Sequence, residues 1–156
     1  MNEKNIINFR IVNICDADVI LSWINDNQVI KNSFRKKKIK KKNNLIFWKK
    51  KIQNNSFHSL IFFCNKKPFG IFSANKKNLD LYINYLISKN FRKKKLATKL
   101  LKRGIKFLKK KYKKNINIYA KVKKNNIISL FSLHSAGFGL KKINRKSVLL
   151  YYKNEN

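Results

Sequence analysis

The clearest pattern in the chain is an apolar repeat of helical period between residues 94 and 112. Apolar side chains recur at the spacing of one helix face, and lysines occupy much of the opposite face. The apolar set is Leu96, Leu100, Leu101, Ile105 and Leu108. Because residues three and four apart share one side of a helix, this segment is predicted to be a long amphipathic helix with its apolar side on the core.

Several shorter segments have the alternation or the continuous apolar run of β-strands. Strands are expected at residues 5–15, 57–64, 69–74, 79–88, 115–120, 137–143 and 147–152. Polar turns at 65–68, 75–78 and 144–146 separate neighbouring strands, as in β-hairpins. The segment 79–88 alternates in a way that suits a strand covered on both faces.

Three more helices are expected. A short one covers residues 19–24, with Asp16 or Asp18 as its N-cap. It is broken by the polar residues 25–27, and a lysine-rich solvated loop follows at 32–44. The second helix covers 45–53, and the third covers 126–136 and ends at Gly137, a natural C-cap. The inward side of the second is expected to carry Leu45, Ile52 and either Phe47 or Trp48.

The order of these elements predicts the fold class. Antiparallel hairpins come first, and a strand, helix, strand crossover follows through residues 79–120. Such a crossover requires a parallel strand pair. We therefore expect a mixed α/β (α+β) fold with a central, mostly antiparallel mixed sheet and helices on both faces. At 156 residues, the chain is expected to form a single domain, residues 1–156.

Composition narrows the class of protein. Hydrophobic residues make up 44% of the chain, enough to form a core, which excludes wholesale disorder. No uncharged apolar run approaches the roughly 20 residues of a membrane span, and the N-terminus lacks a signal-peptide core, so a cytoplasmic protein is expected. Cys15 and Cys64 lie in apolar settings without a CxxC spacing, which favours reduced core thiols over a disulfide or a metal site.

The formal net charge of +33 is large, but the lysine bias weakens it as evidence of function. Only five of the 39 basic residues are arginine, whose planar group makes bidentate phosphate contacts that lysine cannot make. Lys, Asn and Ile, all abundant here, have A/T-rich codons, so genomic bias would produce the same charge. Nonspecific, salt-sensitive association with polyanions is still expected, and a nucleic-acid-binding protein remains the alternative of another class.

A basic stretch lies between the strand 79–88 and the long helix. Residues 92–95 read Arg-Lys-Lys-Lys, and the helical repeat begins directly after them. The first turn of a helix has unpaired backbone N–H groups and the positive end of the helix dipole. That geometry binds phosphate, and lysines beside it strengthen the attraction. The stretch is therefore predicted to bind a phosphate group.

Two motifs at matching distances give the chain a family resemblance. Residues 92–97, Arg-Lys-Lys-Lys-Leu-Ala, follow the pattern Arg/Gln-x-x-Gly-x-Gly/Ala except at the first glycine. Asn126 and Ser129 then precede Ala-Gly-Phe at 136–138. In both respects the chain resembles the GCN5-related N-acetyltransferases (GNATs). The resemblance implies the acyl-CoA N-acyltransferase fold, acetyl-CoA as cofactor, and direct attack of a primary amine on the acetyl group.

The resemblance also implies which residues bind and react. The pantetheine arm would meet the backbone of Leu86, Ile87 and Ser88 and the side chains of Asn126 and Ser129. The pyrophosphate would be held by the loop and first helical turn, which comprise Arg92, Lys93, Lys94, Lys95, Leu96, Ala97 and Thr98. Backbone N–H groups of Tyr85 and Leu86 would stabilise the developing oxyanion.

Two positions depart from the family pattern. Lys95 replaces the first glycine of the loop, and we expect it to take helical dihedral angles while its ammonium adds attraction. Leu133 stands where a tyrosine usually serves as general acid. His134 is its neighbour, but one step along a helix turns a side chain away by about 100°. The same departures leave open a catalytically silent relative that acts through a partner, and the general base cannot be assigned.

The N-terminal half indicates the acceptor. Asp16, Trp23, Asn25 and Asp26 resemble a pattern in GNATs that acetylate nucleotide-linked deoxysugars, as in pseudaminic-acid pathways, or the N-termini of ribosomal proteins. The sugar group is favoured, so the expected partner is a nucleotide sugar. Trp23 is expected to pack in the core. Substrate contacts are expected from Asn25, Asn32, Ser33, Phe34 and His58, although Asn25 and Asp26 could equally cap a helix.

Overall fold

The computed structural model describes residues 6–112 and 116–153. Its seven-stranded sheet has the order β1-β2-β3-β4-β5-β7-β6. The strands are β1 (Ile7–Ile11), β2 (Phe57–Cys64), β3 (Lys67–Lys77), β4 (Asp80–Ile87), β5 (Asn117–Lys123), β6 (Phe138–Ile143) and β7 (Ser147–Tyr152). The helices are α1 (Ala17–Ile24), α2 (Asn27–Asn32), α3 (Lys41–Ile52), α4 (Leu96–Tyr112) and α5 (Ile127–Ser135). All strand pairs but one are antiparallel, which confirms the predicted fold class.

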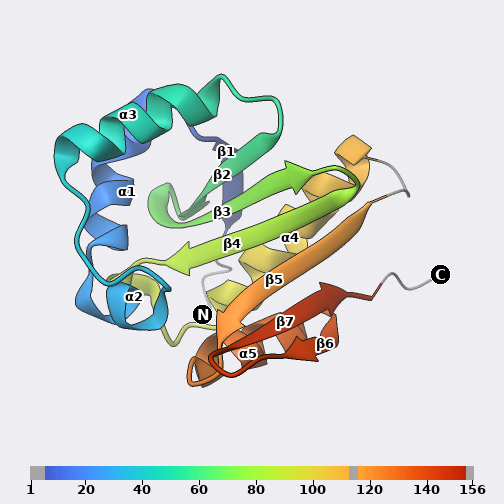
Figure 1. The fold of residues 1–156 in the computed structure, drawn as a ribbon. Coiled ribbons are helices and arrows are strands. Elements are labelled where there is room, and N and C mark those ends of the chain that lie inside the picture. Colours follow the sequence, from blue (N-terminus) through green and yellow to red (C-terminus); the bar gives the residue numbers. More distant parts are fainter. Residues whose placement is uncertain (1–5, 113–115, 154–156) are drawn as a thin grey trace, which may run out of the picture.

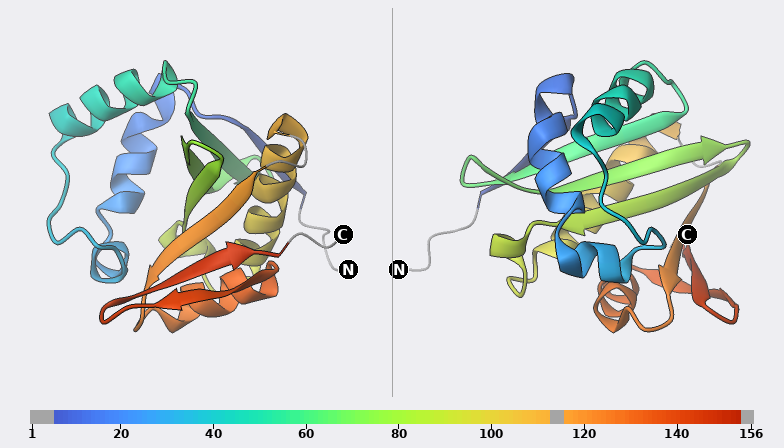
Figure 2. Two further views of the ribbon diagram at one scale, coloured as in Figure 1. Left: turned by 45° about the vertical axis from the view of Figure 1, so that its right-hand side comes forward. Right: turned by 60° about the vertical axis from the view of Figure 1, so that its left-hand side comes forward.

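Helices α1 and α3 lie on one face of the sheet and α4 and α5 on the other (Figures 1 and 2), and the sheet separates two cores. The larger lies under α4 and α5 and takes Leu60 and Phe62 from β2. The smaller lies under α1 and α3 and takes Ile61, the residue between them. This division follows from the alternation of side chains along a strand. Gly104 brings α4 close to the sheet, since a Cβ there would lie 2.6 Å from the Phe72 ring.

The crossover through α4 joins the one parallel strand pair of the described sheet, as predicted. β4 and β5 pair only from Asp80 to Ile83 and from Asn117 to Ala120. Beyond that point β4 continues to Ile87, while β5 pairs on with β7 alone. Figure 1 shows the two strands starting side by side and diverging toward the end where α2 lies. The last residues of β4 therefore have an open edge on their β5 side.

The N-terminal segment differs from the sequence expectation. β1 stops at Ile11, and a 3-10 turn (Ile14–Asp16) follows. Asp16 does not cap α1 with its side chain. Its carboxylate accepts hydrogen bonds from the Asn13 backbone and from both terminal nitrogens of Arg10, at 2.7 and 2.8 Å. This ion pair ends the strand early and leaves Cys15 exposed, contrary to the predicted core position, whereas Cys64 is buried.

The lysine-rich segment contains more helix than its composition indicated. Asp26 accepts a hydrogen bond from the Val29 N–H and caps α2, which the sequence did not predict. α3 begins at Lys41, inside the predicted loop. Its inward positions are Asn44 and Trp48, so the predicted Leu45 and Ile52 are wrong and Trp48 is right. The Asn44 amide donates to the Ala17 carbonyl at 2.8 Å, which sets the helical register against α1.

The remaining boundaries shift by a few residues. β3 runs through most of the predicted turn 75–78 and ends at Lys77. β5 extends past Ala120 to Lys123, and the first predicted residue of that strand, Asn115, lies outside the described residues. None of the helices described is both long enough and apolar enough to cross a membrane.

Candidate active site

The backbone between β4 and α4 forms a tight turn with two left-handed residues. A 3-10 turn (Lys89–Phe91) ends at Arg92, and α4 begins at Leu96. Lys93 has φ 62° and Lys95 has φ 55°, a conformation that residues with a Cβ rarely adopt. The helical dihedral angles expected for Lys95 are therefore wrong. Lys95 instead takes the backbone conformation that glycine adopts without strain, so the turn keeps its shape despite the substitution.

This turn presents donors and charge to one place. Leu96, Ala97 and Thr98 form the first turn of α4, where backbone N–H groups lack helical partners. The Leu96 side chain is buried in the core, so this residue offers only its backbone. The side chains of residues 93–95 are exposed. The turn and helix start together have the donors and the charge that a phosphate-like anion requires, and the phosphate site stays a prediction.

Replacing Lys95 by glycine is expected to stabilise the protein. A left-handed residue with a Cβ costs about 1–2 kcal/mol, and the greater unfolded-state freedom of glycine cancels part of that gain. We expect a net gain of about 1 kcal/mol, seen as a rise of about 3 °C in the thermal midpoint. Lys94 has no positive φ. Lys94→Gly should therefore give no gain, and equal effects of the two variants would contradict the left-handed assignment.

Arg92 has a different role from the lysines beside it. Its guanidinium bonds the Asp26 carboxylate at 2.7 Å and Gln28 at 2.8 Å, and its Nε donates to the Ile87 carbonyl. Burial alone would raise the pKa of Asp26, but the hydrogen bonds from Arg92 and from the Val29 backbone outweigh it and the pKa is lowered. Arg92 thus fastens the end of β4 to the start of α2, and its charge is already paired with Asp26.

The open edge of β4 exposes particular backbone groups. The Ser88 N–H donates to the Phe69 carbonyl, and the Leu79 carbonyl accepts from Asn117 of β5. Because backbone groups alternate sides along a strand, Tyr85 and Ile87 turn their N–H groups toward the open edge, while Leu86 turns its own toward β3. Of the predicted backbone donors, Tyr85 and Ile87 are available at this edge. Leu86 and Ser88 are not, because the sheet uses their N–H groups.

The Tyr85 side chain connects this edge to α5. Its hydroxyl lies near the side chains of Ser129 and Ser132 on α5. Burial raises the pKa of Tyr85 above its ordinary value of 10.0, and the nearby Ser129 and Ser132 only reduce that rise. Leu133, the next residue on α5, is buried in the core. The tyrosine missing at position 133 thus has a hydroxyl counterpart that reaches α5 from β4 and is protonated at neutral pH.

The start of α5 is held by its own cap. The Asn126 side-chain oxygen accepts from the Ser129 backbone N–H at 3.3 Å. Ser129 therefore has its backbone N–H bonded to Asn126 and its side chain near Tyr85. The amide nitrogen of Asn126 is not used in this cap. Asn126, Ser129 and Tyr85 lie together at the α5 side of the open edge.

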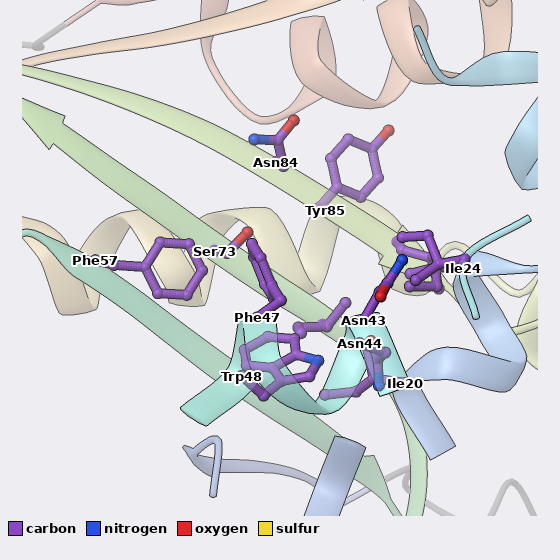
Figure 3. A pocket seen from close by; sticks show the side chains of 13 residues that line it. Ile20, Ile24, Asn43, Asn44, Phe47, Trp48, Phe57, Ser73, Asn84 and Tyr85 are labelled. Carbon is purple, nitrogen blue, oxygen red and sulfur yellow. The ribbon is translucent and has the colours of Figure 1, made fainter. Parts of the chain in front are cut away.

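A cavity of about 470 Å³ lies on the other side of the sheet, between α1, α3 and strands β3 and β4. Its lining is chiefly apolar and includes Ile20, Ile24, Phe47, Trp48, Phe57 and Ile71. Figure 3 shows Trp48 and Ile20 along one side, with Asn84 and Tyr85 along the opposite side. Tyr85 thus borders both the cavity and the open edge of β4. A molecule in the cavity would lie beside the groups that face this edge.

The polar groups of the cavity are amides and hydroxyls. Ser73 and Asn84 are direct cross-strand partners and both line it. Asn43 and Ile39 contribute from the lysine-rich segment. The Trp48 indole nitrogen is buried and has no hydrogen-bond partner. Sequence reasoning missed all of these residues, because they come from four separate elements and follow no common spacing.

The predicted substrate residues lie elsewhere. The Asn25 side chain donates to the Ile39 carbonyl and accepts from the Ile39 N–H, and its oxygen also accepts from Arg35. Asn25 therefore connects α1 to the lysine-rich segment. Ser33 bonds backbone carbonyls at the end of α2, and Phe34 lies under the Lys121 ammonium of β5. Asn32 is the last residue of α2, and Ser33 and Phe34 follow it. All three lie outside the cavity lining. Trp23, expected in the core, is half-buried against the smaller core.

His58 is on the wrong face for substrate. It shares the α4 face of β2 with Leu60 and Phe62, and its Nε2 contacts the Tyr112 hydroxyl at the end of α4. The cavity lies on the opposite face, where Phe57 points. The assignment of His58 as a substrate residue is therefore corrected to a packing role. Asp80, expected near a turn, accepts from the Asn117 amide at the start of the parallel pair.

His58 is expected to make folding stability depend on pH. Burial, then Lys111 and Lys76, lower its pKa below the ordinary 6.5, so the unfolded chain takes up a proton first as pH falls. The free energy of unfolding should decrease below about pH 6.5, by at most about 1.4 kcal/mol per pH unit. Urea titrations of His58→Asn should show a flatter dependence. The same substitution at the exposed His134 is the control. Equal slopes in wild type and His58→Asn would contradict the assignment.

The part of the chain described here contains no group of three or more His, Cys, Asp or Glu residues placed to hold a metal ion. Its four aspartates are all engaged: Asp16 with Arg10, Asp18 with Lys41, Asp26 with Arg92, and Asp80 with Asn117. None lines the cavity. The site therefore consists of backbone donors, lysines, one protonated tyrosine and an apolar cavity.

Comparison with known proteins identifies relatives of this arrangement. The family model described as acetyltransferase (GNAT) family matches residues 22–138. The fold is similar to that of spermidine N-acetyltransferase from Vibrio cholerae in complex with CoA and spermine. In that comparison the TM-score is 0.83 and the identity 16%, over 93% of this chain and 94% of the other. No curated protein sequence matches the chain.

A second similar structure is the aminoglycoside acetyltransferase AAC(6')-Ib in complex with coenzyme A. Its TM-score is 0.81 and its identity 14%, over 96% of this chain and 95% of the other. A domain from Methanocaldococcus jannaschii has a TM-score of 0.83 and 18% identity, over 95% and 98% of the two chains. At these identities the similarity is one of fold.

Proposed function

Because the chain belongs to the acetyltransferase (GNAT) family, we propose that it transfers the acetyl group of acetyl-CoA to the primary amine of a nucleotide-linked deoxysugar. Acetyl-CoA is the cofactor of this family, and membership makes the protein an acyltransferase. The acceptor is the part that this chain's own residues must indicate. The observation that carries the proposal is the position of Tyr85, between the open edge of β4 and the cavity.

The residues present fit acetyl-CoA. We assign the diphosphate to the turn of residues 93–95 and the first N–H groups of α4, and the pantetheine arm to the open edge at Tyr85 and Ile87. Asn126, at the start of α5, has an amide nitrogen to offer the same arm. Arg92 supports the site indirectly, through Asp26. Lys95 in the glycine conformation favours a working loop over the silent alternative.

The residues near the cavity favour an acceptor amine that is linked to an anionic group. Ile39 lines the cavity and has lysines on both sides in the sequence, within a run of seven basic residues among eight at positions 35–42. Most of these lysines are exposed. A nucleotide diphosphate would meet their charge outside the cavity while its amino sugar lay inside. The aromatic lining suits a deoxysugar, which presents more apolar surface than a fully hydroxylated sugar.

The proposed reaction requires few catalytic groups from the protein. The amine attacks the acetyl carbon, the bond from that carbon to sulfur breaks, and the sulfur takes up a proton. We assign the Tyr85 N–H to the carbonyl oxygen as negative charge develops there. Tyr85 Oη, which lies near Ser129 and Ser132, carries the proton for the sulfur. Among the described residues, no carboxylate or histidine lines the cavity, so the amine is expected to lose its proton to water.

An acceptor assay tests the proposal. The purified protein is incubated with acetyl-CoA and a nucleotide-linked 4-amino-deoxysugar, and thiol release and the mass of the product are measured. We expect one acetyl group on the sugar amine, and much slower transfer to the same sugar without its nucleotide. Peptides with an apolar N-terminal residue form the second arm, since the cavity would also admit an apolar side chain. Faster transfer to the peptides would replace the sugar acceptor by a protein N-terminus.

A further inference from the structure

The cavity has an uncommon charge balance for an enzyme that binds amines. An amine is a cation in water, and cationic ligands with several charges are held by carboxylates. Here no described carboxylate lines the cavity, and each of the four described aspartates already has a partner elsewhere. The chain as a whole carries a formal charge of +33. A ligand with several positive charges would be repelled without any compensating contact.

The cavity lining offers apolar and hydrogen-bonding contacts in place of carboxylates. Trp48, Phe57 and Ile71 form an apolar surface from three elements. Trp48 is 4% exposed, and its indole N–H has no acceptor in the protein, although a buried donor of this kind normally has one. Ser73 and Asn84 lie opposite each other on β3 and β4 beside Tyr85. These groups suit a ligand with one amine, an apolar ring or chain, and an oxygen acceptor.

We propose that the cavity selects monoamine acceptors that place an apolar ring or chain against Trp48, Phe57 and Ile71, and that it excludes polyamines and aminoglycosides. This deepens the proposed function by naming the acceptor class, and it rests on the same site. The single amine lies at the Ser73 and Asn84 end, next to Tyr85. The Trp48 indole donates to an oxygen of the acceptor. Anionic groups of the acceptor extend outward to the lysines on either side of Ile39.

The test measures binding without requiring turnover. The chain has two tryptophans, so Trp23→Phe leaves Trp48 as the only indole reporter. The probes are 2-phenylethylamine, spermidine and kanamycin, titrated with fluorescence as the readout. We expect 2-phenylethylamine to change Trp48 emission, with a dissociation constant at least about tenfold lower than that of spermidine or kanamycin. Equal or tighter binding of spermidine or kanamycin, or no response to 2-phenylethylamine at millimolar concentration, overturns the proposal.

A substitution of nearly identical shape supplies the second measurement. Asn84→Asp puts one carboxylate into the lining, and Asn8→Asp makes the same charge change at an exposed position of β1 outside the lining. Asn84→Asp is expected to tighten spermidine about tenfold, and Asn8→Asp to leave it unchanged. Equal effects of the two variants overturn the proposal.

The two proposals fail separately. The predicted binding preferences without acetyl transfer to any acceptor would reject the function and retain the cavity's selectivity. Efficient acetylation of spermidine or kanamycin alongside the nucleotide sugar would reject the cavity's selectivity and retain the proposed function.

Discussion

Replacing Tyr85 by phenylalanine is expected to lower kcat by about 100-fold or more, with acetyl-CoA affinity nearly unchanged. The variant keeps the ring and the backbone N–H and removes only the hydroxyl near Ser129 and Ser132. A positioned general acid contributes about 10²- to 10⁴-fold to a rate. Steady-state thiol release measures kcat, and calorimetric titration measures cofactor affinity.

The control for this variant is Tyr82→Phe. Tyr82 lies on the same strand, is 37% exposed and stacks on Tyr119, outside the cavity lining. The Tyr82→Phe variant should retain the wild-type kcat within about twofold. Because the pKa of Tyr85 is raised above 10.0, its hydroxyl stays protonated between about pH 6 and 9, and wild-type kcat should show no alkaline decline from this group there. A Tyr85→Phe enzyme with wild-type kcat would remove Tyr85 from the mechanism.

Reversing the charges of Lys93 and Lys95 is expected to weaken acetyl-CoA binding about 100-fold. Both side chains are exposed at the turn that precedes α4, and both are left-handed. Glutamates there place two negative charges beside the site assigned to the diphosphate, at about tenfold for each reversal. Isothermal calorimetry at low salt measures the dissociation constant, and the loss should shrink as salt rises.

The control is a double charge reversal at two other lysines, in α4. Lys106→Glu with Lys110→Glu makes the same net change on the exposed side of α4, two to four turns from its start. If both double variants weaken acetyl-CoA equally, only the overall charge matters and the turn is not the phosphate site. Arg92 is a less direct test, because its loss also breaks the ion pair to Asp26.

Much of the fold could be predicted because it depends on local periodicity. The α4 repeat placed Leu96, Leu100 and Leu108 inside, and all three are buried. The strand, helix, strand order required one parallel pair, and β4 with β5 is that pair. The predictions failed where a distant partner decided the outcome. Asn44 set the register of α3 through its bond to Ala17, 27 residues away, and no apolar pattern contains that contact.

The candidate site divides in the same way. The basic turn before α4 was predictable, since its residues are contiguous and follow a family pattern. The alternation along β2 also predicted which of its residues share a face. Nothing local in the sequence indicated which face borders the cavity, and His58, predicted to contact substrate, lies on the opposite face. Tyr85 was predicted for its backbone alone. The role of its hydroxyl depends on α5, more than 40 positions further along the chain.

The sequence by itself determined most of the elements, their order and the basic turn to which we assign the diphosphate, because each depends on residues close together in the chain. Only the tertiary structure decided which residues line the cavity beside β4, that Arg92 is paired with Asp26, and that Lys93 and Lys95 are left-handed. The physical reason is common to all three. Packing and ion pairing join residues from separate elements, and where β4 and β5 part depends on how every other strand of the sheet is paired.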